Sequence, residues 1–276
     1  MIENLICWHD NKWIALKHVN VSILDFGFIH NDATYDVMKT SNGKILFYDK
    51  HVKRYENSCE FFGFTPVDNI DSIVEELLQI NKIKDAFVWV CNWRGKPPSG
   101  SPRDMSGPEH MVVYVKPYYN IADSAVDLGL YREYCRTPDT TIPQKYKNFG
   151  WIELTKAQKY ADDNDFDSAI ILDTDGNVTE GPGFGICFVK GGEVYTPQNN
   201  CLNSITIQVV EDLCNDLNIQ FNRTDISVRD MYNSDEVFIC STSGGITPVN
   251  QIEHKTYKND LTTILVEEFK KHASKN

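Results

Sequence analysis

A glycine-rich bend between two apolar runs is the feature that most constrains this chain. The bend lies within residues 174–197, which read TDGNVTEGPGFGICFVKGGEVYTP. The bend lies between two runs that are rich in β-branched and apolar residues, as buried strands are: SAIILD before it and ICFVK after it. The Asp-Gly and Gly-Gly pairs of this stretch mark turns. One carboxylate, Glu180, precedes Gly181-Pro182-Gly183, where small side chains leave room for a flat ligand. A glutamate in a solvated turn is the alternative, and this stretch alone does not exclude it.

The charge and the cysteines narrow the class of protein. With 27 basic and 39 acidic residues, the formal charge of -12 repels nucleic acids and anionic lipid surfaces. The eight cysteines show neither a CxxC pair nor metal-ligand spacing, so we expect reduced thiols, no disulfide framework and no metal site. The stretch MIENLICWHDNKW lacks the basic region and the long apolar core of a secretion signal, so we expect no leader, and the sequence has no run of about 18 apolar residues. We expect a cytoplasmic protein with no nucleic-acid partner and no membrane contact.

Strand-like and helix-like segments occur in both halves of the chain without regular alternation. In the first half we expect a strand pair, KWIAL with HVNVSIL, helices at 49–62 and 71–80, and the apolar strands DAFVWVCNW and HMVVYVKPY. In the second half we expect a helix from Trp151 to about Ala161, one that opens with Asn203 and Ser204, and one near the C-terminus.

This pattern predicts an α+β (mixed α/β) architecture of two domains. Residues 1–117 form a small N-terminal domain, residues 118–126 a linker, and residues 127–276 a large C-terminal domain. The stretch RGKPPSGSPRDMSGPE, between the two apolar strands, is rich in Pro, Gly and Ser. Such a composition predicts a mobile surface loop, of the kind that often closes over a site.

Two short motifs combine small side chains, hydroxyls and backbone N–H groups. They are NSIT at 203–206, which opens a helix, and STSGG at 241–245. Helix N-terminal amides and Ser/Thr hydroxyls can hold a phosphate without a metal, helped by a cation such as Arg54. Either motif alone is also an ordinary N-cap or turn. Their joint presence is what indicates a phosphate site.

A phosphate site together with an isolated carboxylate fits pyridoxal phosphate, which has one phosphate and one basic ring nitrogen. This cofactor also needs a lysine with which it forms a Schiff base. The segment PQKYKNFGW offers Lys145 and Lys147, and Lys156 follows in the next predicted helix. Lys147 precedes an aromatic run that enters this helix. A surface lysine is the alternative, and the composition does not choose among the three.

The chain resembles the class IV (fold type IV) pyridoxal-phosphate aminotransferases over most of its length, from about Val21 to Val249. The resemblance is carried by FIHNDATYDV, DKHVKRYENS, AFVWV followed by RG, RTP, YKNFGW and TEGPGF. These motifs are most similar to those of the (R)-selective amine transaminases. The group also contains branched-chain and D-amino-acid aminotransferases and aminodeoxychorismate lyases. The resemblance implies the two-domain fold of this group and pyridoxal 5'-phosphate as the cofactor.

The resemblance implies a role for each matching residue. Lys147 carries the cofactor and moves a proton as general base and acid, and Glu180 pairs with the pyridine nitrogen. Arg54 holds the phosphate. The other implied cofactor contacts are Gly183 and Trp151, together with two pairs that hold the phosphate with Arg54, namely Ile205-Thr206 and Thr242-Ser243.

The resemblance also implies a substrate pocket. His30, Tyr35 and Trp89 line it, and Ser243 contacts the substrate as well as the cofactor. Arg103 of the Pro/Gly-rich loop matches a lid arginine that clamps the carboxylate of a keto acid and turns outward for an apolar amine. Core packing is the alternative for Trp89, and a solvated side chain is the alternative for Arg103.

The chain departs from the family pattern in three places. Gly185 stands where the family often has asparagine. LNSITI replaces LPGITR, which exchanges Pro-Gly for Asn203-Ser204 and puts Ile207 in place of an arginine. Trp151 replaces a tyrosine of the branched-chain enzymes, and the (R)-amine group shares this tryptophan.

These observations predict a transaminase that moves an amino group from an (R)-amine or an amino acid to a 2-keto acid such as pyruvate. The alternative within the family is a branched-chain aminotransferase, followed by a D-amino-acid aminotransferase or a lyase of the aminodeoxychorismate type. A non-catalytic relative that keeps the fold is the alternative from another class. By resemblance we expect a homodimer with small-molecule amine, amino-acid and keto-acid substrates.

Overall fold

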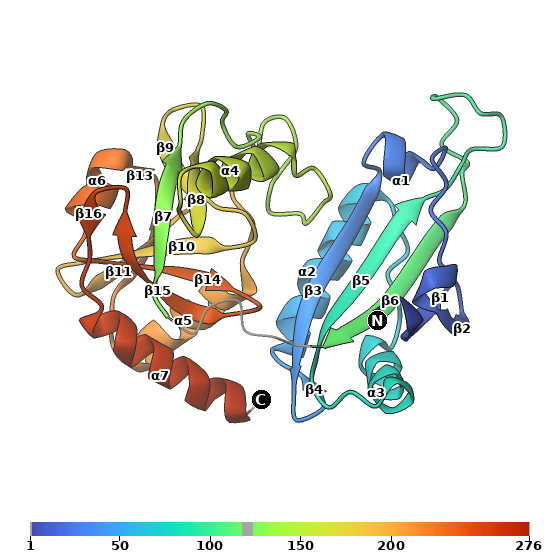
Figure 1. Cartoon of the computed structure of the whole chain (residues 1–276), viewed down its shortest axis with the longest axis horizontal. Helices are drawn as coiled ribbons and strands as arrows, with labels where there is room; N and C mark the ends of the chain where they lie inside the picture. Colours follow the sequence, from blue (N-terminus) through green and yellow to red (C-terminus); the bar gives the residue numbers. More distant parts are fainter. Residues whose placement is uncertain (1, 118–123, 276) are drawn as a thin grey trace. The chain divides into compact units, whose positions relative to one another are not determined.

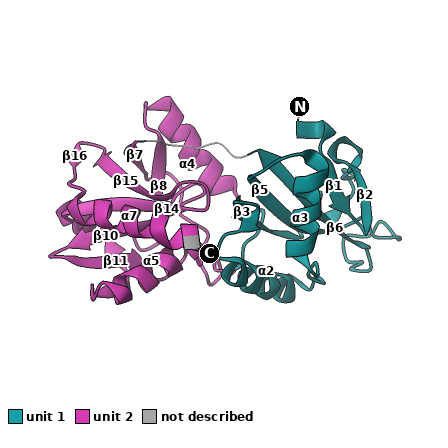
Figure 2. Ribbon diagram, turned by 90° about the horizontal axis from the view of Figure 1, so that it is seen from below, with its two compact units in different colours: residues 1–119, 146–150, 276 teal, residues 120–145, 151–275 magenta. Residues whose placement is uncertain are grey.

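The computed structural model describes residues 2–117 and 124–275, which form two compact units (Figure 2). Unit 1 comprises the described residues up to 117 together with Tyr146–Gly150, and unit 2 comprises the others. The expected linker falls largely on residues 118–123, which lie outside the described residues. One segment differs from the predicted division. Lys147 was expected in the C-terminal domain, whereas Tyr146–Gly150 groups with the N-terminal residues.

Unit 1 is built on a six-stranded antiparallel sheet in the order β2-β1-β6-β5-β3-β4 (Figure 1). The two predicted apolar strands, β5 and β6, pair along their whole length. The strands are β1 (Ile6–His9), β2 (Lys12–Ala15), β3 (Ala33–Ser41), β4 (Lys44–Ile45), β5 (Ala86–Arg94) and β6 (Glu109–Pro117). The helices are η1 (Ile2–Asn4), η2 (Leu16–His18), α1 (Phe26–Ile29), α2 (Tyr48–Phe62) and α3 (Ile70–Asn81).

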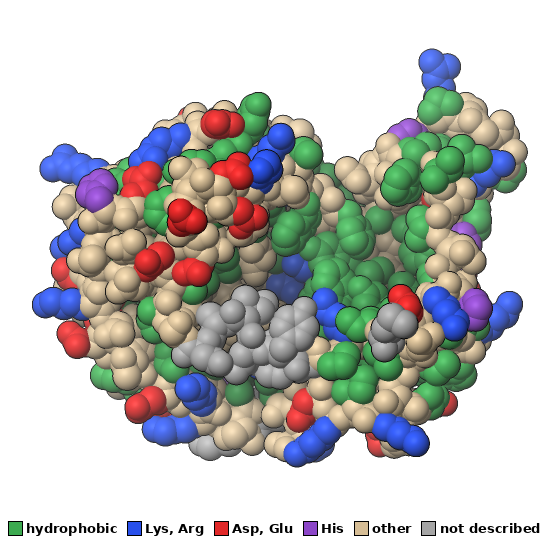
Figure 3. All heavy atoms as spheres, viewed as in Figure 1, with side chains coloured by type: hydrophobic (Ala, Val, Ile, Leu, Met, Phe, Trp, Pro, Cys, Tyr) green, Lys and Arg blue, Asp and Glu red, His purple; other side chains and the backbone are tan. Residues whose placement is uncertain are grey.

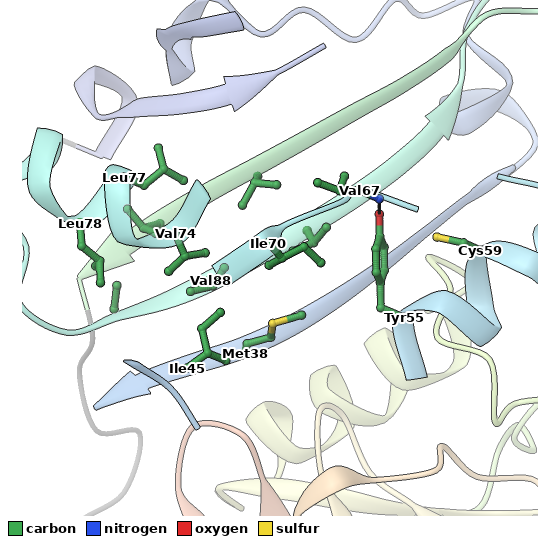
Figure 4. Packing of buried hydrophobic residues seen from close by; sticks show 14 of the residues in the cluster. Met38, Ile45, Tyr55, Cys59, Val67, Ile70, Val74, Leu77, Leu78 and Val88 are labelled. Atoms are coloured by element: carbon green, nitrogen blue, oxygen red, sulfur yellow. Dashed lines mark hydrogen bonds between the residues drawn. The ribbon is translucent and has the colours of Figure 1, made fainter. Parts of the chain in front are cut away.

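Helices α2 and α3 pack on the sheet of unit 1 because their apolar residues recur every three to four positions. Figure 4 shows Val74 of α3 in one cluster with Met38 of β3 and Val88 of β5. Tyr55 of α2 is fully buried in the same cluster, and its hydroxyl accepts the Val67 N–H at 3.1 Å. Both expected helices of the first half are therefore confirmed.

The expected pairing of KWIAL with HVNVSIL is wrong. KWIA is β2, and it pairs with the preceding strand β1 across a turn at Asp10 and Asn11, whose φ angles are 46° and 62°. Asp and Asn adopt positive φ more readily than most residues, and two such residues in succession suit a tight hairpin. HVNVSIL, all of which is described, lies outside every strand and leaves Val21, Ile23 and Leu24 exposed.

Unit 2 is built on a sheet of mixed strand direction, in the order β12-β11-β10-β14-β15-β7-β8-β9-β13, with β16 paired to β15. The pairs β11–β12, β15–β7 and β7–β8 are parallel, and the other pairs are antiparallel. The predicted α+β class is thus confirmed.

The strands of unit 2 are β7 (Val126–Tyr131), β8 (Ser168–Leu172), β9 (Asn177–Glu180), β10 (Gly185–Lys190), β11 (Glu193–Pro197), β12 (Phe221–Thr224), β13 (Ile226–Ser227), β14 (Glu236–Ser241), β15 (Gly245–Ile252) and β16 (Lys255–Thr256). The helices are α4 (Ile152–Asp163), α5 (Ile205–Asp216), α6 (Val228–Asn233) and α7 (Asp260–Lys275). The three helices predicted for the second half correspond to α4, α5 and α7.

The glycine-rich bend forms strands joined by a tight turn, as predicted. β9 ends at Glu180, and the residues 181 and 184 that follow exchange backbone hydrogen bonds of 3.0 and 3.2 Å. Pro182 and Gly183 form the centre of this turn. The φ of Gly183 is 82°, which a Pro-Gly turn of type II requires at its second central position. The bend therefore fixes the backbone next to Glu180.

The charges on the surface, the helix lengths and the cysteines can be compared with the expected partners. On the face drawn in Figure 3, basic side chains are scattered among acidic and neutral ones. Within residues 2–117 and 124–275, no helix is long and apolar enough to cross a membrane, and no group of three His, Cys, Asp or Glu side chains could hold a metal. All eight cysteines are free thiols, of which six are buried and Cys135 alone is exposed.

Candidate active site

Lys147 lies in a short segment that pairs with the edge of β3. Thr34 and Asn148 form an isolated antiparallel bridge. The Lys147 carbonyl accepts a hydrogen bond from Thr34 Oγ1 at 2.7 Å, and its N–H donates to Ser58 Oγ of α2 at 3.1 Å. Ser58 donates in turn to the Arg54 carbonyl at 2.9 Å. The backbone of Lys147 is therefore held on one side by a strand and on the other by a helix.

The side-chain amine of Lys147 lies over an aromatic ring. Its Nζ is 4.6 Å from the ring centre of Tyr35, a distance at which the ring face attracts a cation. Tyr35 is buried, stacks on Trp89 at 5.2 Å and contacts the ring of Phe149 at 4.5 Å. Trp89 stacks in turn on Tyr114. These four aromatic residues, here called the aromatic wall, give the surroundings of the amine an apolar character.

Arg54 is buried on α2 and is held by a carboxylate of β3. Its Nε donates to Asp36 Oδ2 at 2.7 Å, and its Nη2 donates to Asp36 Oδ1 at 2.8 Å. His51, one turn earlier on α2, places its Nδ1 2.8 Å from the same Oδ1. The three side chains are buried, and together they are here called the Arg54 cluster. The planar guanidinium matches both oxygens of one carboxylate, which fixes its orientation.

Burial and charge set the protonation of this cluster. Burial by itself raises the pKa of Asp36, but the charge of Arg54 and the contact with His51 hold that pKa well below its ordinary value. Burial lowers the pKa of His51, and the charges of Arg54 and Lys147 add to this against the opposing effect of Asp36. His51 is therefore neutral at pH 7. Because a carboxylate only accepts, the proton of the neutral ring lies on Nδ1.

Glu180 is buried at the end of β9 with both carboxylate oxygens hydrogen-bonded. Oε1 accepts from Arg136 Nε at 2.8 Å, and Oε2 accepts from the N–H of Leu202, just before α5, at 3.1 Å. Each carboxylate oxygen has two lone pairs. Glu180 can therefore accept a further hydrogen bond, for example from a protonated ring nitrogen.

Arg136 connects Glu180 to a second buried carboxylate. Its Nη1 donates to Glu153 in the first turn of α4, and Glu153 also accepts from the N–H and Oγ1 of Thr137. Burial opposes the charge of Arg136, but the two carboxylates outweigh it and raise its pKa. Burial raises the pKa of Glu153, whereas its hydrogen bonds and Arg136 bring it below the ordinary value. Arg136, Glu153 and Glu180 are here called the Glu180 cluster.

Of the glycines after Glu180, Gly181 is required by a close contact and Gly183 by its positive φ of 82°. A Cβ added at Gly181 would lie 2.0 Å from the Phe184 ring, so no other residue fits there without a shift. A Cβ added at Gly183 would lie 3.7 Å from the ring of Trp151, which precedes α4. The structure thus brings Gly183 and Trp151, two of the expected cofactor contacts, next to each other.

Two of the departures from the family pattern meet at Gly185. A Cβ added at Gly185 would lie 2.6 Å from Cδ1 of Ile207, so the missing side chain makes room for this isoleucine. The predicted N-cap, Ser204, accepts the Ile207 N–H at 3.4 Å and starts α5. Gly185 and Ile207 therefore form one coupled change in packing.

The two predicted phosphate motifs come together in unit 2. Gly185 pairs with Cys240 at the end of β14 and faces the start of α5, so the turn after β14 lies near this helix. Ile205 and Thr206 are buried in the first turn of α5. Within the turn after β14, the hydroxyls of Ser241 and Ser243 are hydrogen-bonded at 3.0 Å, and Ser243 is half-buried.

Comparison with known proteins identifies the family. The family described as Amino-transferase class IV matches residues 33–252, well over half of the chain. The chain belongs to the class IV aminotransferases. It is 26% identical, over 95% of its length and 94% of the other, to a Methanocaldococcus jannaschii protein provisionally named a branched-chain-amino-acid aminotransferase. It is 27% identical to a D-alanine aminotransferase of Staphylococcus haemolyticus, over 88% of each chain.

Solved structures of aminotransferases share the fold. The branched-chain aminotransferase of Thermoproteus uzoniensis with norvaline matches with a TM-score of 0.91 and 21% identity, over 97% of this chain and 94% of that one. The branched-chain enzyme of Escherichia coli matches with a TM-score of 0.88 and 19% identity, over 96% and 93%. The predictions of a fold type IV architecture, an aminotransferase and pyridoxal 5'-phosphate as the cofactor of its family are confirmed.

The donors and acceptors of this aminotransferase fit that cofactor. Lys147 provides an amine against an aromatic ring, and Arg54 provides a buried cation. Glu180 provides a buried carboxylate that can accept another hydrogen bond, and the capped start of α5 provides backbone amides. These are the groups that an aldehyde, a phosphate and a basic ring nitrogen need.

Two of the expected substrate residues are exposed in unit 1. His30 ends α1, and its ring lies 4.4 Å from that of Phe26. Arg103 belongs to the loop between β5 and β6, which is organised by Asp104 through hydrogen bonds from the hydroxyls of Ser99 and Ser106. These hydrogen bonds lower the pKa of Asp104. The substrate roles of both residues stay predictions.

The structure also reveals two residues to which the sequence assigns no role. Asp36 and Arg136 belong to the motifs TYDV and RTP, and each holds a predicted cofactor residue. The sequence holds one signal for Asp36, which is a charged residue among the apolar residues of a strand. Because burying a charge is costly unless it is paired, such a residue indicates a buried partner of opposite charge. No signal was available for Arg136, because its partner Glu180 is 44 positions away and no periodicity connects them.

Proposed function

We propose that this aminotransferase transfers the amino group of an amino acid with an apolar side chain to a 2-keto acid such as pyruvate. The observation that carries the proposal is the placement of Lys147, whose backbone is bound by Thr34 and Ser58 and whose amine lies on Tyr35. The aromatic wall beside this amine supports an apolar donor. The relatives named as branched-chain and D-alanine aminotransferases support an amino-acid donor over a simple amine.

Lys147 is both nucleophile and proton carrier in this proposal. When bound, the cofactor supplies an aldehyde that condenses with amines and a ring that accepts the electron pair of a broken C–H bond. Nζ of Lys147 holds the cofactor between turnovers and takes the proton from the substrate α-carbon after the donor has displaced it. Because both backbone groups of Lys147 are hydrogen-bonded, its amine moves through side-chain rotations, which would keep it near the reacting carbon of a bound substrate.

The other predicted residues would bind the cofactor through its separate groups. Glu180 would accept a hydrogen bond from the protonated ring nitrogen, while Arg136 and the Leu202 N–H keep its carboxylate in place. Arg54 would bind the phosphate. The remaining contacts with the phosphate and the ring would come from Ile205, Thr206, Thr242, Ser243, Gly183 and Trp151.

A second candidate donor is an (R)-amine. Trp151 supports it, because the resemblance to the (R)-selective amine transaminases includes this tryptophan. The exposed Arg103 also supports it, since a guanidinium on a surface loop can turn inward for a keto-acid carboxylate and outward for an apolar amine. With either donor, the proposed substrate contacts are His30, Tyr35, Trp89, Arg103 and Ser243.

The link between Lys147 and the cofactor is tested with Lys147→Ala and with Lys145→Ala as the matched control. Wild-type protein and the control should be yellow with bound cofactor and lose this absorbance when a good donor is added. Borohydride reduction should leave the cofactor on a peptide that contains Lys147. Lys147→Ala should lose this label and about 10⁴-fold in rate, because it lacks both nucleophile and base. A label on Lys145, or on neither lysine, would contradict the proposal.

The donor class is tested with L-leucine, D-alanine and (R)-1-phenylethylamine, each with pyruvate as acceptor except that 2-oxoglutarate replaces it for D-alanine. We expect one of the two amino acids to exceed the amine by about tenfold or more in kcat/KM. Activity with the amine alone would replace the amino-acid proposal by the second candidate. A protein that binds the cofactor but uses none of these donors would favour a non-catalytic relative.

We also propose that the chain forms a homodimer in the cytoplasm. Unit 1 exposes several large apolar side chains close together in sequence, and an exposed apolar patch can mark a protein interface: Val21, Ile23, Leu24, Phe28 and Ile29. Eight free thiols support a reducing compartment. In sedimentation experiments, Ile23→Glu combined with Phe28→Glu should give a monomer, whereas Ile80→Glu, an exposed position on α3, should not. A wild-type monomer would contradict the proposal.

A further inference from the structure

We propose that Asp36 is a positioning residue that fixes the Arg54 guanidinium for the phosphate of the cofactor. The inference rests on the proposed function in one respect, which is that Arg54 binds this phosphate. Asp36 has no exposed surface, so it acts through Arg54 and not by touching a ligand.

The contact between Asp36 and Arg54 fixes the guanidinium in position and in plane. Nε and Nη2 of Arg54 donate to different oxygens of Asp36, at 2.7 and 2.8 Å. Two parallel hydrogen bonds between planar groups leave the guanidinium little freedom to rotate. An arginine side chain otherwise has many rotamers, and holding it in one before the ligand arrives lowers the entropy lost on binding.

His51 holds the carboxylate from a third direction. Its Nδ1 donates to Asp36 Oδ1 at 2.8 Å, so Asp36 accepts three hydrogen bonds from two side chains of α2. The carboxylate therefore cannot turn without breaking contacts to both Arg54 and His51. Because His51 is neutral, the charge of Asp36 is balanced by Arg54.

The same elements also hold the predicted catalytic lysine. Asp36 is two residues from Thr34, which binds the Lys147 carbonyl. The carbonyl of Arg54 accepts from Ser58, which binds the Lys147 N–H. One stretch of β3 and one stretch of α2 thus determine where both the cation and the reactive amine lie.

Positioning and charge predict opposite effects of removing this carboxylate. A negative charge repels a phosphate, so if charge were the main effect of Asp36, its loss would tighten phosphate binding. If Asp36 positions Arg54, its loss weakens phosphate binding, because the guanidinium is then no longer held in place. The sign of the change therefore separates the two effects.

The test compares two ligands that differ only in the phosphate. Apoprotein is titrated with pyridoxal 5'-phosphate and with pyridoxal, and binding is followed by absorbance and by quenching of tryptophan fluorescence. Asp36→Asn should raise the Kd of pyridoxal 5'-phosphate by about tenfold or more and should change the Kd of pyridoxal by less than about threefold. Asp36→Glu should recover part of the loss. In an Arg54→Gln background, Asp36→Asn should have little further effect, because the group through which it acts is gone.

Each other outcome decides against the inference. Three results would each overturn it. They are an equal loss of affinity for both ligands, losses of affinity that add fully in the double variant, and tighter binding of pyridoxal 5'-phosphate. If Asp36→Asn does not fold, as judged by circular dichroism, His51→Gln tests the same carboxylate and should show a smaller loss confined to the phosphate form. Wild-type protein that binds neither ligand would overturn the proposed function itself, which distinguishes the two failures.

Discussion

The two units hold their buried charges in different ways. In unit 1, the Arg54 cluster pairs one guanidinium with one carboxylate, and a neutral imidazole completes it. In unit 2, the Glu180 cluster places one guanidinium between two carboxylates. The first cluster has balanced formal charges beside a titratable ring, whereas the second has one more acid than base.

This difference determines how each cluster can respond to a lost charge. His51 can take up a proton if the balance around Asp36 is disturbed, because its ordinary pKa is near neutral. The Glu180 cluster has no such group, and two buried carboxylates without Arg136 would repel each other. The unit 1 cluster is therefore expected to tolerate the loss of its arginine better than the unit 2 cluster. Three experiments test this comparison.

The largest effect is expected from Arg136→Met. It leaves Glu153 and Glu180 buried together, and removal of one partner from a buried ion pair costs about 3–5 kcal/mol of unfolding free energy. Urea unfolding of the apoprotein measures this loss. Arg132→Met is the matched control, because Arg132 is half-exposed and its pair with Glu253 is a surface salt bridge, worth about 0–1 kcal/mol. Equal losses in both variants would show that the Glu180 cluster does not act as a buried ion network.

A smaller and pH-dependent effect is expected from Arg54→Met. At pH 8 it leaves Asp36 with a neutral His51, and we expect a loss of about 2–3 kcal/mol in unfolding free energy. At pH 6 the loss should shrink, because without Arg54 the carboxylate raises the pKa of His51 and the protonated ring replaces the missing cation. Urea unfolding at the two pH values measures the difference. A loss independent of pH, or one larger than that of Arg136→Met, would contradict the comparison.

The smallest effect concerns wild-type stability as the pH falls. The pKa of His51 is lowered in the folded state, so below about pH 6.5 the unfolded chain binds a proton that the folded chain does not. Unfolding free energy should therefore fall with decreasing pH in this window, by at most about 1.4 kcal/mol per pH unit for this one proton. The lowered pKa of Asp36 acts in the same direction, but only below its ordinary value of 3.8.

The contribution of His51 is isolated by His51→Gln. This variant should show a shallower fall in unfolding free energy between pH 6.5 and pH 5 than the wild type, and His18→Gln, which removes an exposed histidine of the same unit, serves as the control. If His51→Gln leaves the slope unchanged, the pKa of His51 does not differ between the folded and unfolded states, and the expectation is wrong.

Several parts of the fold follow from local sequence. The glycine-rich bend became a turn next to Glu180 because Pro182 and Gly183 suit its backbone angles, and Ser204 started α5 because its hydroxyl can accept a helix N–H. The HVNVSIL segment shows the limit of this reasoning. Its apolar residues have strand propensity, but β2 already pairs with β1, and an apolar segment can also remain exposed at a surface.

The sequence by itself determined which residues are the candidates for the chemistry of this aminotransferase, because the lysine, the acid, the arginine and the small turn residues are each readable in their motifs. Only the tertiary structure decided what holds them. Asp36 meets Arg54 across a strand and a helix, and Arg136 meets Glu180 from a distant loop. Such contacts join residues that no periodicity relates, since a buried charge is paired with whatever group the folded chain brings within hydrogen-bond distance.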